Sequence, residues 1–196
     1  MIDWEAMSIA DTARELGRGL QCFERRVKDN QTKTTTIRFP RGVIRTTSDY
    51  VRTKLSFLPD DVVARNIAYT LQATDVNRWL VNRFDLGLSA SSLFYKQACV
   101  TLVSAMEAVL SAVWHNRHPD HTSNKRFADV IDGLSQEGVL SRETAAMLHE
   151  ARRRRNDIHL HRVTHREGNT YNVRDYNNVV AIEHRMIEEL RHGVVP

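Results

Sequence analysis

The residues best suited to chemistry lie in one short segment. Arg152 to Arg155 form an unbroken run of four arginines, and Asn156, His159 and His161 follow them. An arginine stays charged at every physiological pH and offers a planar fork of donors to phosphate oxygens. A histidine can exchange protons near neutral pH. The segment therefore combines groups that bind phosphate with groups that move protons.

This segment is predicted to lie on a helix from Arg142 to about Val163. At about 100° per residue, the inward stripe of that helix consists of Met147, Leu148, Ala151 and Ile158. Arg155 falls within the stripe. Arg154 and His161 fall along one edge, and Arg155 and His159 along the other. At least one arginine and one histidine are thus expected to face a packed surface, where an arginine is costly unless it is paired or used.

Glu107 is the only acidic residue between Lys96 and Asp120, in the most apolar stretch of the chain. A buried carboxylate requires a partner. We therefore expect Glu107 to pair with Arg154 or Arg155 and to fix the guanidinium. The alternative is that Glu107 lies on a narrow strip that faces solvent.

The elements that must position these residues are predicted to be helices. Helical periodicity covers residues 2–27 through Ile9, Ala13, Leu16, Leu20, Phe23 and Val27, with Gly17 and Gly19 weakening the middle. Residues 33–47 are rich in threonine and β-branched residues around Pro40 and Gly42, which favours a small hairpin or an extended arm. Asp60 is placed to cap a helix that runs to about Arg83.

Four further helices are expected. The first is a central helix over 91–114, the second a shorter one from Thr122 or Ser123 to Leu134, and the third the arginine-bearing helix, which Ser141 caps. The last covers 175–191, with Glu188 and Glu189 pointing outward. The predicted fold class is all-α, an antiparallel helical bundle. The predicted division is a basic appendage over 1–58, made of a small N-terminal helix and an extended or hairpin segment, and a bundle over 59–196.

Composition narrows the function classes. The 196 residues carry a net charge of +4, with a basic stretch that includes Arg38, Arg41 and Arg45. A nucleic-acid partner is therefore permitted, with these residues and Arg152 and Arg153 as backbone contacts.

Other classes are disfavoured. Two distant cysteines exclude a disulfide scaffold, and the histidines at 115, 118 and 121 flank Pro119 without a metal-site pattern, so neither a metal nor a cofactor is expected. No apolar run approaches the length of a membrane span, and the N-terminus lacks the layout of a signal peptide. A cytoplasmic location without a membrane partner follows as an expectation.

From about Asp60 to Arg191 the chain resembles the HEPN superfamily. Members of that superfamily are helical bundles that carry an arginine, usually followed by a polar residue, and a histidine four to six residues later. Arg155-Asn156 followed by His161 fits with five intervening residues, Arg154 to His159 with four, and Arg154 to His161 with six. The long apolar helix with Met106-Glu107-Ala108 and the Leu-Ser-Arg-Glu start at residue 140 agree with the same family.

The resemblance implies a metal-independent endoribonuclease of the toxin or antiviral-defence type, active as a homodimer in which two such helices meet. It implies Arg155 for phosphate stabilisation, His161 or His159 for proton transfer, and Asn156 in support, with Arg154 as the other possible arginine. A neutralising antitoxin or another partner protein is possible in such systems. Attack of a 2′-OH on the adjacent phosphate needs both proton transfer and charge stabilisation, which this residue set supplies.

The sequence also allows two other hypotheses for the function. A catalytically inactive HEPN-like module would bind nucleic acid or a partner protein through the same basic residues. A purely structural dimerisation domain would carry them only as solvated surface.

Overall fold

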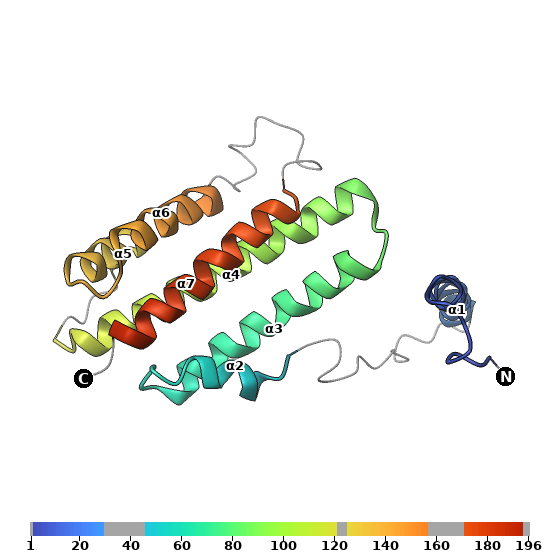
Figure 1. Ribbon diagram of the computed structural model, residues 1–196, viewed down its shortest axis with the longest axis horizontal. Coiled ribbons are helices and arrows are strands. Elements are labelled where there is room, and N and C mark those ends of the chain that lie inside the picture. Colours follow the sequence, from blue (N-terminus) through green and yellow to red (C-terminus); the bar gives the residue numbers. More distant parts are fainter. Residues whose placement is uncertain (1, 30–45, 121–124, 157–170, 194–196) are drawn as a thin grey trace. The chain divides into compact units, whose positions relative to one another are not determined.

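The computed structural model describes residues 2–29, 46–120, 125–156 and 171–193 of the chain. Seven helices and no strand occur in these ranges (Figure 1). The chain divides into two compact units, Met1–Phe39 and Pro40–Pro196. The predicted all-α class is confirmed for the described part of the chain.

The first unit contains α1 (Ile9–Asp29). The helix begins seven residues later than the periodicity suggested, because Ser8 caps it: the Ser8 hydroxyl accepts a hydrogen bond from the Asp11 N–H at 3.1 Å. No residue of α1 is buried. The helix is amphipathic along its whole length.

The second unit is built around an antiparallel pair, α3 (Asp61–Arg83) and α4 (Gly87–Arg117). Asp60 caps α3 as predicted, because its Oδ1 accepts hydrogen bonds from the N–H groups of Val62 and Val63. Buried residues on several sides of α4 place this helix at the centre of the bundle. Among the described helices, α4 alone is long and apolar enough to cross a membrane, but about half of its most apolar window is buried inside the protein.

The next two helices, α5 (Phe127–Gln136) and α6 (Arg142–Asn156), form a hairpin at one end of α4. Gly133 lies inside α5, beneath the indole ring of Trp114. Gly138 takes a φ of 75° in the turn between α5 and α6, a backbone conformation that glycine adopts without strain. Ser141 caps α6 as predicted, and its hydroxyl accepts from the Thr144 N–H at 3.1 Å.

The last helix, α7 (Val173–Gly193), runs in the same direction as α4, whereas α3 and α6 run in the opposite direction (Figure 1). The predicted antiparallel arrangement is thus found for α3 with α4 and for α6 with α7, whereas α4 and α7 run parallel. The reason is that α6 returns the chain to the end of the bundle where α4 begins, and α7 starts from there.

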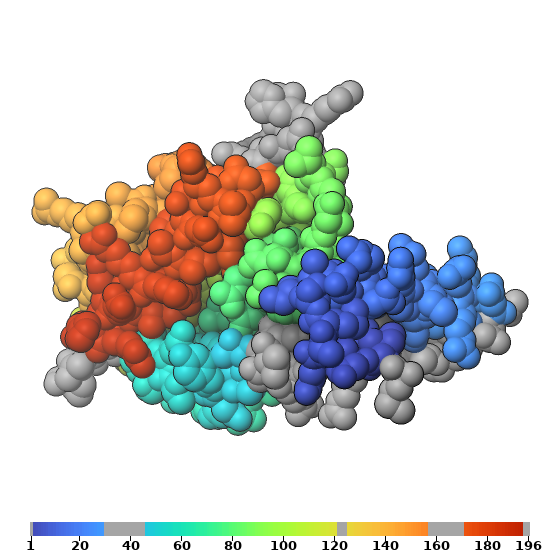
Figure 2. Space-filling view, turned by 45° about the vertical axis from the view of Figure 1, so that its right-hand side comes forward, coloured from blue at the N-terminus to red at the C-terminus, as the bar shows by residue number. Residues whose placement is uncertain are grey.

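The predicted appendage over 1–58 is also too long. Residues 48–54 form a helix, α2 (Ser48–Lys54), and Val51, Leu55 and Leu58 are buried in the core of the bundle. Figure 2 shows α2 against the C-terminal half of α7, where the Arg191 guanidinium donates to the carbonyl of Thr53 at 3.3 Å. The predicted hairpin or arm falls almost entirely on residues 30–45, which lie outside the described residues.

Candidate functional site

Arg155 continues the buried stripe of α6. Thr144, Leu148 and Ala151 are almost completely buried on the inward side of the helix, and Arg155 follows Ala151 after one further turn. Its side chain keeps 29% of its surface exposed. The guanidinium therefore lies where the packed core meets solvent, as the helical spacing predicted.

Glu107 of α4 holds this guanidinium. Arg155 Nη1 donates a hydrogen bond to Glu107 Oε2, and the carboxylate side chain is 33% exposed. On α4, Glu107 lies next to the buried Met106 and one turn before the buried Leu110, so the carboxylate extends from the edge of the buried face. The expected ion pair is confirmed for Arg155, and the alternative of a purely solvent-facing Glu107 is wrong.

The neighbouring arginines pair with other carboxylates. Arg154 donates to Glu150 at 3.2 Å and to Asp175 of α7 at 2.8 Å, and Arg153 donates to Glu150 at 2.8 Å. The hydrogen bond that Arg154 donates to Glu150 is the main cause that raises the pKa of Arg154, and its bond to Asp175 adds to this effect. Arg154 therefore ties α6 to α7, whereas Arg155 ties α6 to α4.

A groove of about 380 Å³ lies between α6 and α7 beside Arg154. Its apolar lining comes from Met147, Ala151, Val179, Ala181 and Ile182, and its polar lining from Glu150, Arg154, Asp175, Asn178 and Arg185. Charges of both signs thus line the groove. This arrangement suits a ligand or chain segment that has an apolar part and polar groups beside it.

Two more of the predicted site residues can be placed. Arg152 is half-buried, and its Nε has no hydrogen-bond partner within the described part of the chain. Asn156 is the last residue of α6 and is half-buried. His159, His161, Arg38, Arg41 and Arg45 lie outside the described residues, so the choice between the two histidines stays open.

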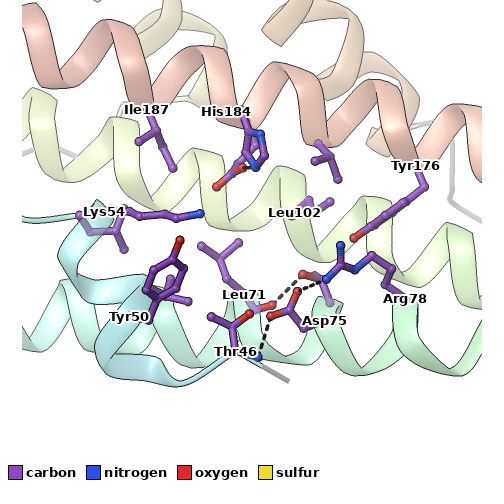
Figure 3. A pocket seen from close by; sticks show the side chains of 15 residues that line it. Thr46, Tyr50, Lys54, Leu71, Asp75, Arg78, Leu102, Tyr176, His184 and Ile187 are labelled. Atoms are coloured by element: carbon purple, nitrogen blue, oxygen red, sulfur yellow. Dashed lines mark hydrogen bonds and ion pairs between the residues drawn. The ribbon is translucent and has the colours of Figure 1, made fainter. Parts of the chain in front are cut away.

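A second cluster of ionisable side chains lines a cavity of about 140 Å³ between α2, α3, α4 and α7 (Figure 3). Glu183 of α7 is only 8% exposed, and burial raises its pKa, while His184 and Lys54 act in the opposite direction. Burial likewise raises the pKa of Tyr176. Figure 3 shows Lys54, Asp75, Arg78 and His184 among the side chains around the same space.

This cluster was not predicted from the sequence, although the sequence holds one signal for it. Glu183 follows Val179 by four residues and precedes Met186 and Ile187 by three and four, so it lies on the inward stripe of α7. Asp75 is held in place from the other side of the cavity. Its Oδ2 accepts the N–H of Thr46 at 3.2 Å, and Gln72 donates to the carbonyl of Thr46 at 2.7 Å.

Within the described ranges, no group of three or more His, Cys, Asp or Glu side chains is arranged to hold a metal ion. His115 and His118 accordingly have protein partners: His115 Nδ1 lies 2.7 Å from the carbonyl of Ser111, and His118 Nε2 lies 2.9 Å from Glu137. No protein-family model, no curated protein and no solved structure matches the chain.

Proposed function

We propose that the protein is a HEPN-like, metal-independent endoribonuclease that acts as a homodimer, with its site at the C-terminal end of α6. The observation that carries the proposal is the position of Arg155. A charged side chain ends the buried stripe of α6 and is fixed from the central helix by Glu107. An arginine that serves only solubility needs no such placement, because it can extend into water from the outer side of the helix.

The arrangement supports the chemistry of RNA cleavage in two respects. A guanidinium has five N–H donors, and the bond to Glu107 engages one of them at Nη1. The remaining donors of a guanidinium fixed in this way can stabilise charge that develops on phosphate oxygens, without a reorganisation cost during the reaction. His161 or His159, a few residues further along the chain, would then exchange the proton of the attacking 2′-OH.

The test is cleavage of single-stranded and structured RNAs in excess chelator by the wild type, Arg155→Ala, His159→Ala and His161→Ala. Arg142→Ala is the matched control, because Arg142 is an exposed arginine at the opposite end of the same helix. We expect Arg155→Ala and one histidine variant to lose about 100-fold or more of the rate, the typical effect of removing one stabilising donor. Arg142→Ala should cut as the wild type does.

Each variant is checked for helicity and oligomeric mass, so that unfolding is not mistaken for loss of chemistry. A folded wild type that cuts none of these RNAs would overturn the proposal. If Arg155→Ala cleaves RNA as fast as the wild type does, the assignment of the site to Arg155 would be overturned.

One observation favours the inactive module as the second candidate. Each of Arg153, Arg154 and Arg155 is paired with a carboxylate, which reduces the positive potential that these arginines offer to a phosphate backbone. In that case the groove between α6 and α7 would hold a partner without cleaving it. If the protein binds RNA with an affinity that falls steeply with salt but does not cleave it, the result would support the inactive RNA-binding module. If it neither binds nor cleaves RNA, the structural dimerisation domain is the hypothesis that is left.

A further inference from the structure

The apolar residues of α1 follow a strict heptad pattern. Their spacing alternates between four and three residues along the helix, through Ile9, Ala13, Leu16, Leu20, Phe23 and Val27. This is the 3.5-residue repeat of coiled coils. It gives an apolar stripe that is narrower than the apolar stripe of a helix that covers a globular core. With Ala13, Leu20 and Val27 assigned to position a, the other three residues occupy position d.

Much of this stripe is exposed in the described part of the chain. No residue of α1 is buried there: the exposed fractions are 91% for Ile9, 53% for Leu16 and 36% for Leu20, and Phe23 and Val27 are half-buried. The charged side chains of α1 are almost all on the opposite side, where Arg14 pairs with Asp11 and Arg18 with Glu15. A 21-residue helix with one apolar stripe depends on packing for its stability, because isolated helices of this kind are marginal in water.

Two glycines lie on either side of the stripe at its midpoint. Gly17 and Gly19 fall at the e and g positions beside Leu16 and Leu20. A Cβ built on either glycine would meet no atom within 4 Å, so nothing in the described chain requires glycine there. Glycine in a helix interior lowers helix stability, but it allows a second helix to approach closely.

We propose that α1 packs antiparallel against α1 of a second copy of this chain, with the crossing point at Arg18. In this register every apolar residue of one copy meets an apolar residue of the other. Leu16 faces Leu20, Ala13 faces Phe23, and Ile9 faces Val27. The small Ala13 meets the large Phe23, and the other two layers pair aliphatic side chains, so that all layers have similar volume, which is a requirement of a well-packed core.

The parallel alternative fits poorly. It would place Ala13 against Ala13 and Phe23 against Phe23, which leaves a gap in one layer and crowds another. In the antiparallel register, Gly17 meets Gly17 and Gly19 meets Gly19 across the two-fold axis, so the helices can approach most closely where they cross.

Charge favours the same orientation. The half of α1 before the midpoint carries Asp11 and Glu15 against the single basic residue Arg14. The half after the midpoint carries Arg25, Arg26 and Lys28 against Glu24 and Asp29. Antiparallel packing lays the net-acidic half of one helix along the net-basic half of the other, with most of these side chains on the outer sides of the pair, and it also opposes the two helix dipoles. The occupant that this surface fits is therefore a second copy of the same helix.

The test is disulfide cross-linking in the full chain on a Cys22→Ser background, with Ala13→Cys in one preparation and Phe23→Cys in another that carries a tag of different mass. Under mild oxidation, we expect a mixed dimer between the two preparations and little cross-linking within either. Dimers within each preparation would show a parallel arrangement and overturn the proposal. No cross-link in any mixture would overturn it as well, since the stripe would then be covered by another surface.

A second measurement uses stripe variants. Leu16→Glu with Leu20→Glu places charges in the central layers, whereas Gln21→Glu with Cys22→Glu adds the same charge on the outer side. On the Ala13→Cys and Phe23→Cys preparations, the first pair should abolish the mixed cross-link and the second should leave it. An unchanged cross-link in the stripe variant would contradict the proposal. Because the cross-link reports α1 alone, this test is independent of any dimer formed by the bundle and of the ribonuclease assay.

Discussion

Glu107 of α4 and Arg155 of α6, 48 residues apart in sequence, form an ion pair at the end of the buried stripe of α6. The pair joins the central helix of the bundle to the helix that carries the arginine run. It also sets the direction of the guanidinium that follows the buried stripe of α6. The candidate site therefore depends on the packing of α6 against α4.

Removing the charge of Glu107 should loosen this connection. Glu107→Gln keeps the shape of the side chain but weakens the bond to Arg155. We expect the free energy of unfolding to fall by about 1 kcal/mol or less, because both side chains are about one-third exposed and solvent screens the pair. Chemical denaturation measures this change, with the exposed Glu188→Gln as the control. Unchanged stability together with unchanged activity would refute a role for the pair.

Gly133 should not tolerate even a methyl group. A Cβ at this position would lie 2.3 Å from the Cζ3 atom of the Trp114 ring, which is itself packed in the core. Gly133→Ala should therefore lower the free energy of unfolding by about 1–3 kcal/mol, despite the higher helix propensity of alanine. Thermal unfolding measures the effect. A gain in stability would show that the indole ring can move aside.

The buried carboxyl of Glu183 should make stability depend on pH. Because burial raises its pKa in the folded state, the folded protein binds this proton more tightly than the unfolded chain does. The stabilising contribution of the protonated Glu183 is therefore fully present below the pKa that Glu183 has in the unfolded chain. It is lost as the pH rises through the pKa that Glu183 has in the folded protein.

We expect Glu183→Gln to reduce this loss and to be more stable than the wild type at neutral pH. Lys54 and His184, which favour the charged form, limit the difference, and Asp75 increases it. Urea midpoints between pH 4 and pH 8 give the comparison. A wild type that gains stability relative to Glu183→Gln as pH rises would contradict it.

The two cysteines should differ sharply in reactivity. Cys22 is exposed on α1, whereas Cys99 is buried in α4, and burial raises the pKa of its thiol to about 12. Since the thiolate is the reactive form, a thiol reagent should modify Cys22 in the native protein and Cys99 only after unfolding. Mass spectrometry of the labelled protein counts the modified thiols, and rapid native labelling of Cys99 would be the contrary result.

Glu189 should contribute to stability although it was expected to point outward. Its carboxylate accepts hydrogen bonds from the N–H and hydroxyl of Ser141, at 2.9 and 2.8 Å, and from the hydroxyl of Thr144 at 2.7 Å. Burial acts to raise the pKa of Glu189, but these hydrogen bonds outweigh it and the pKa is lowered.

Glu189→Ala should therefore cost about 1–2 kcal/mol, the range of a lost helix cap with its hydrogen bonds. The neighbouring Glu188 is exposed, so Glu188→Ala is the matched control and should leave stability unchanged. Equal denaturation midpoints for the two variants would show that the Ser141 contacts contribute little.

Much of the helical organisation could be predicted from the sequence alone. The periodicity of apolar residues located α3, α4, α6 and α7, and the caps at Asp60 and Ser141 were found from residue types at helix starts. The same periodicity placed Arg155 on the inward side of α6. These features are local, because they depend on the geometry of one helix and on hydrogen bonds between near neighbours in the chain.

Only the tertiary structure decided which groups meet. It determined that Glu107 pairs with Arg155 rather than Arg154, and that Glu189 caps α6. It also determined that Glu183 is enclosed by α2, α3 and α7, and that α7 runs parallel to α4. The short helix α2 also owes its place to packing, since Val51, Leu55 and Leu58 are buried against the bundle. These outcomes depend on how all the helices together bury their apolar sides, which no local spacing specifies.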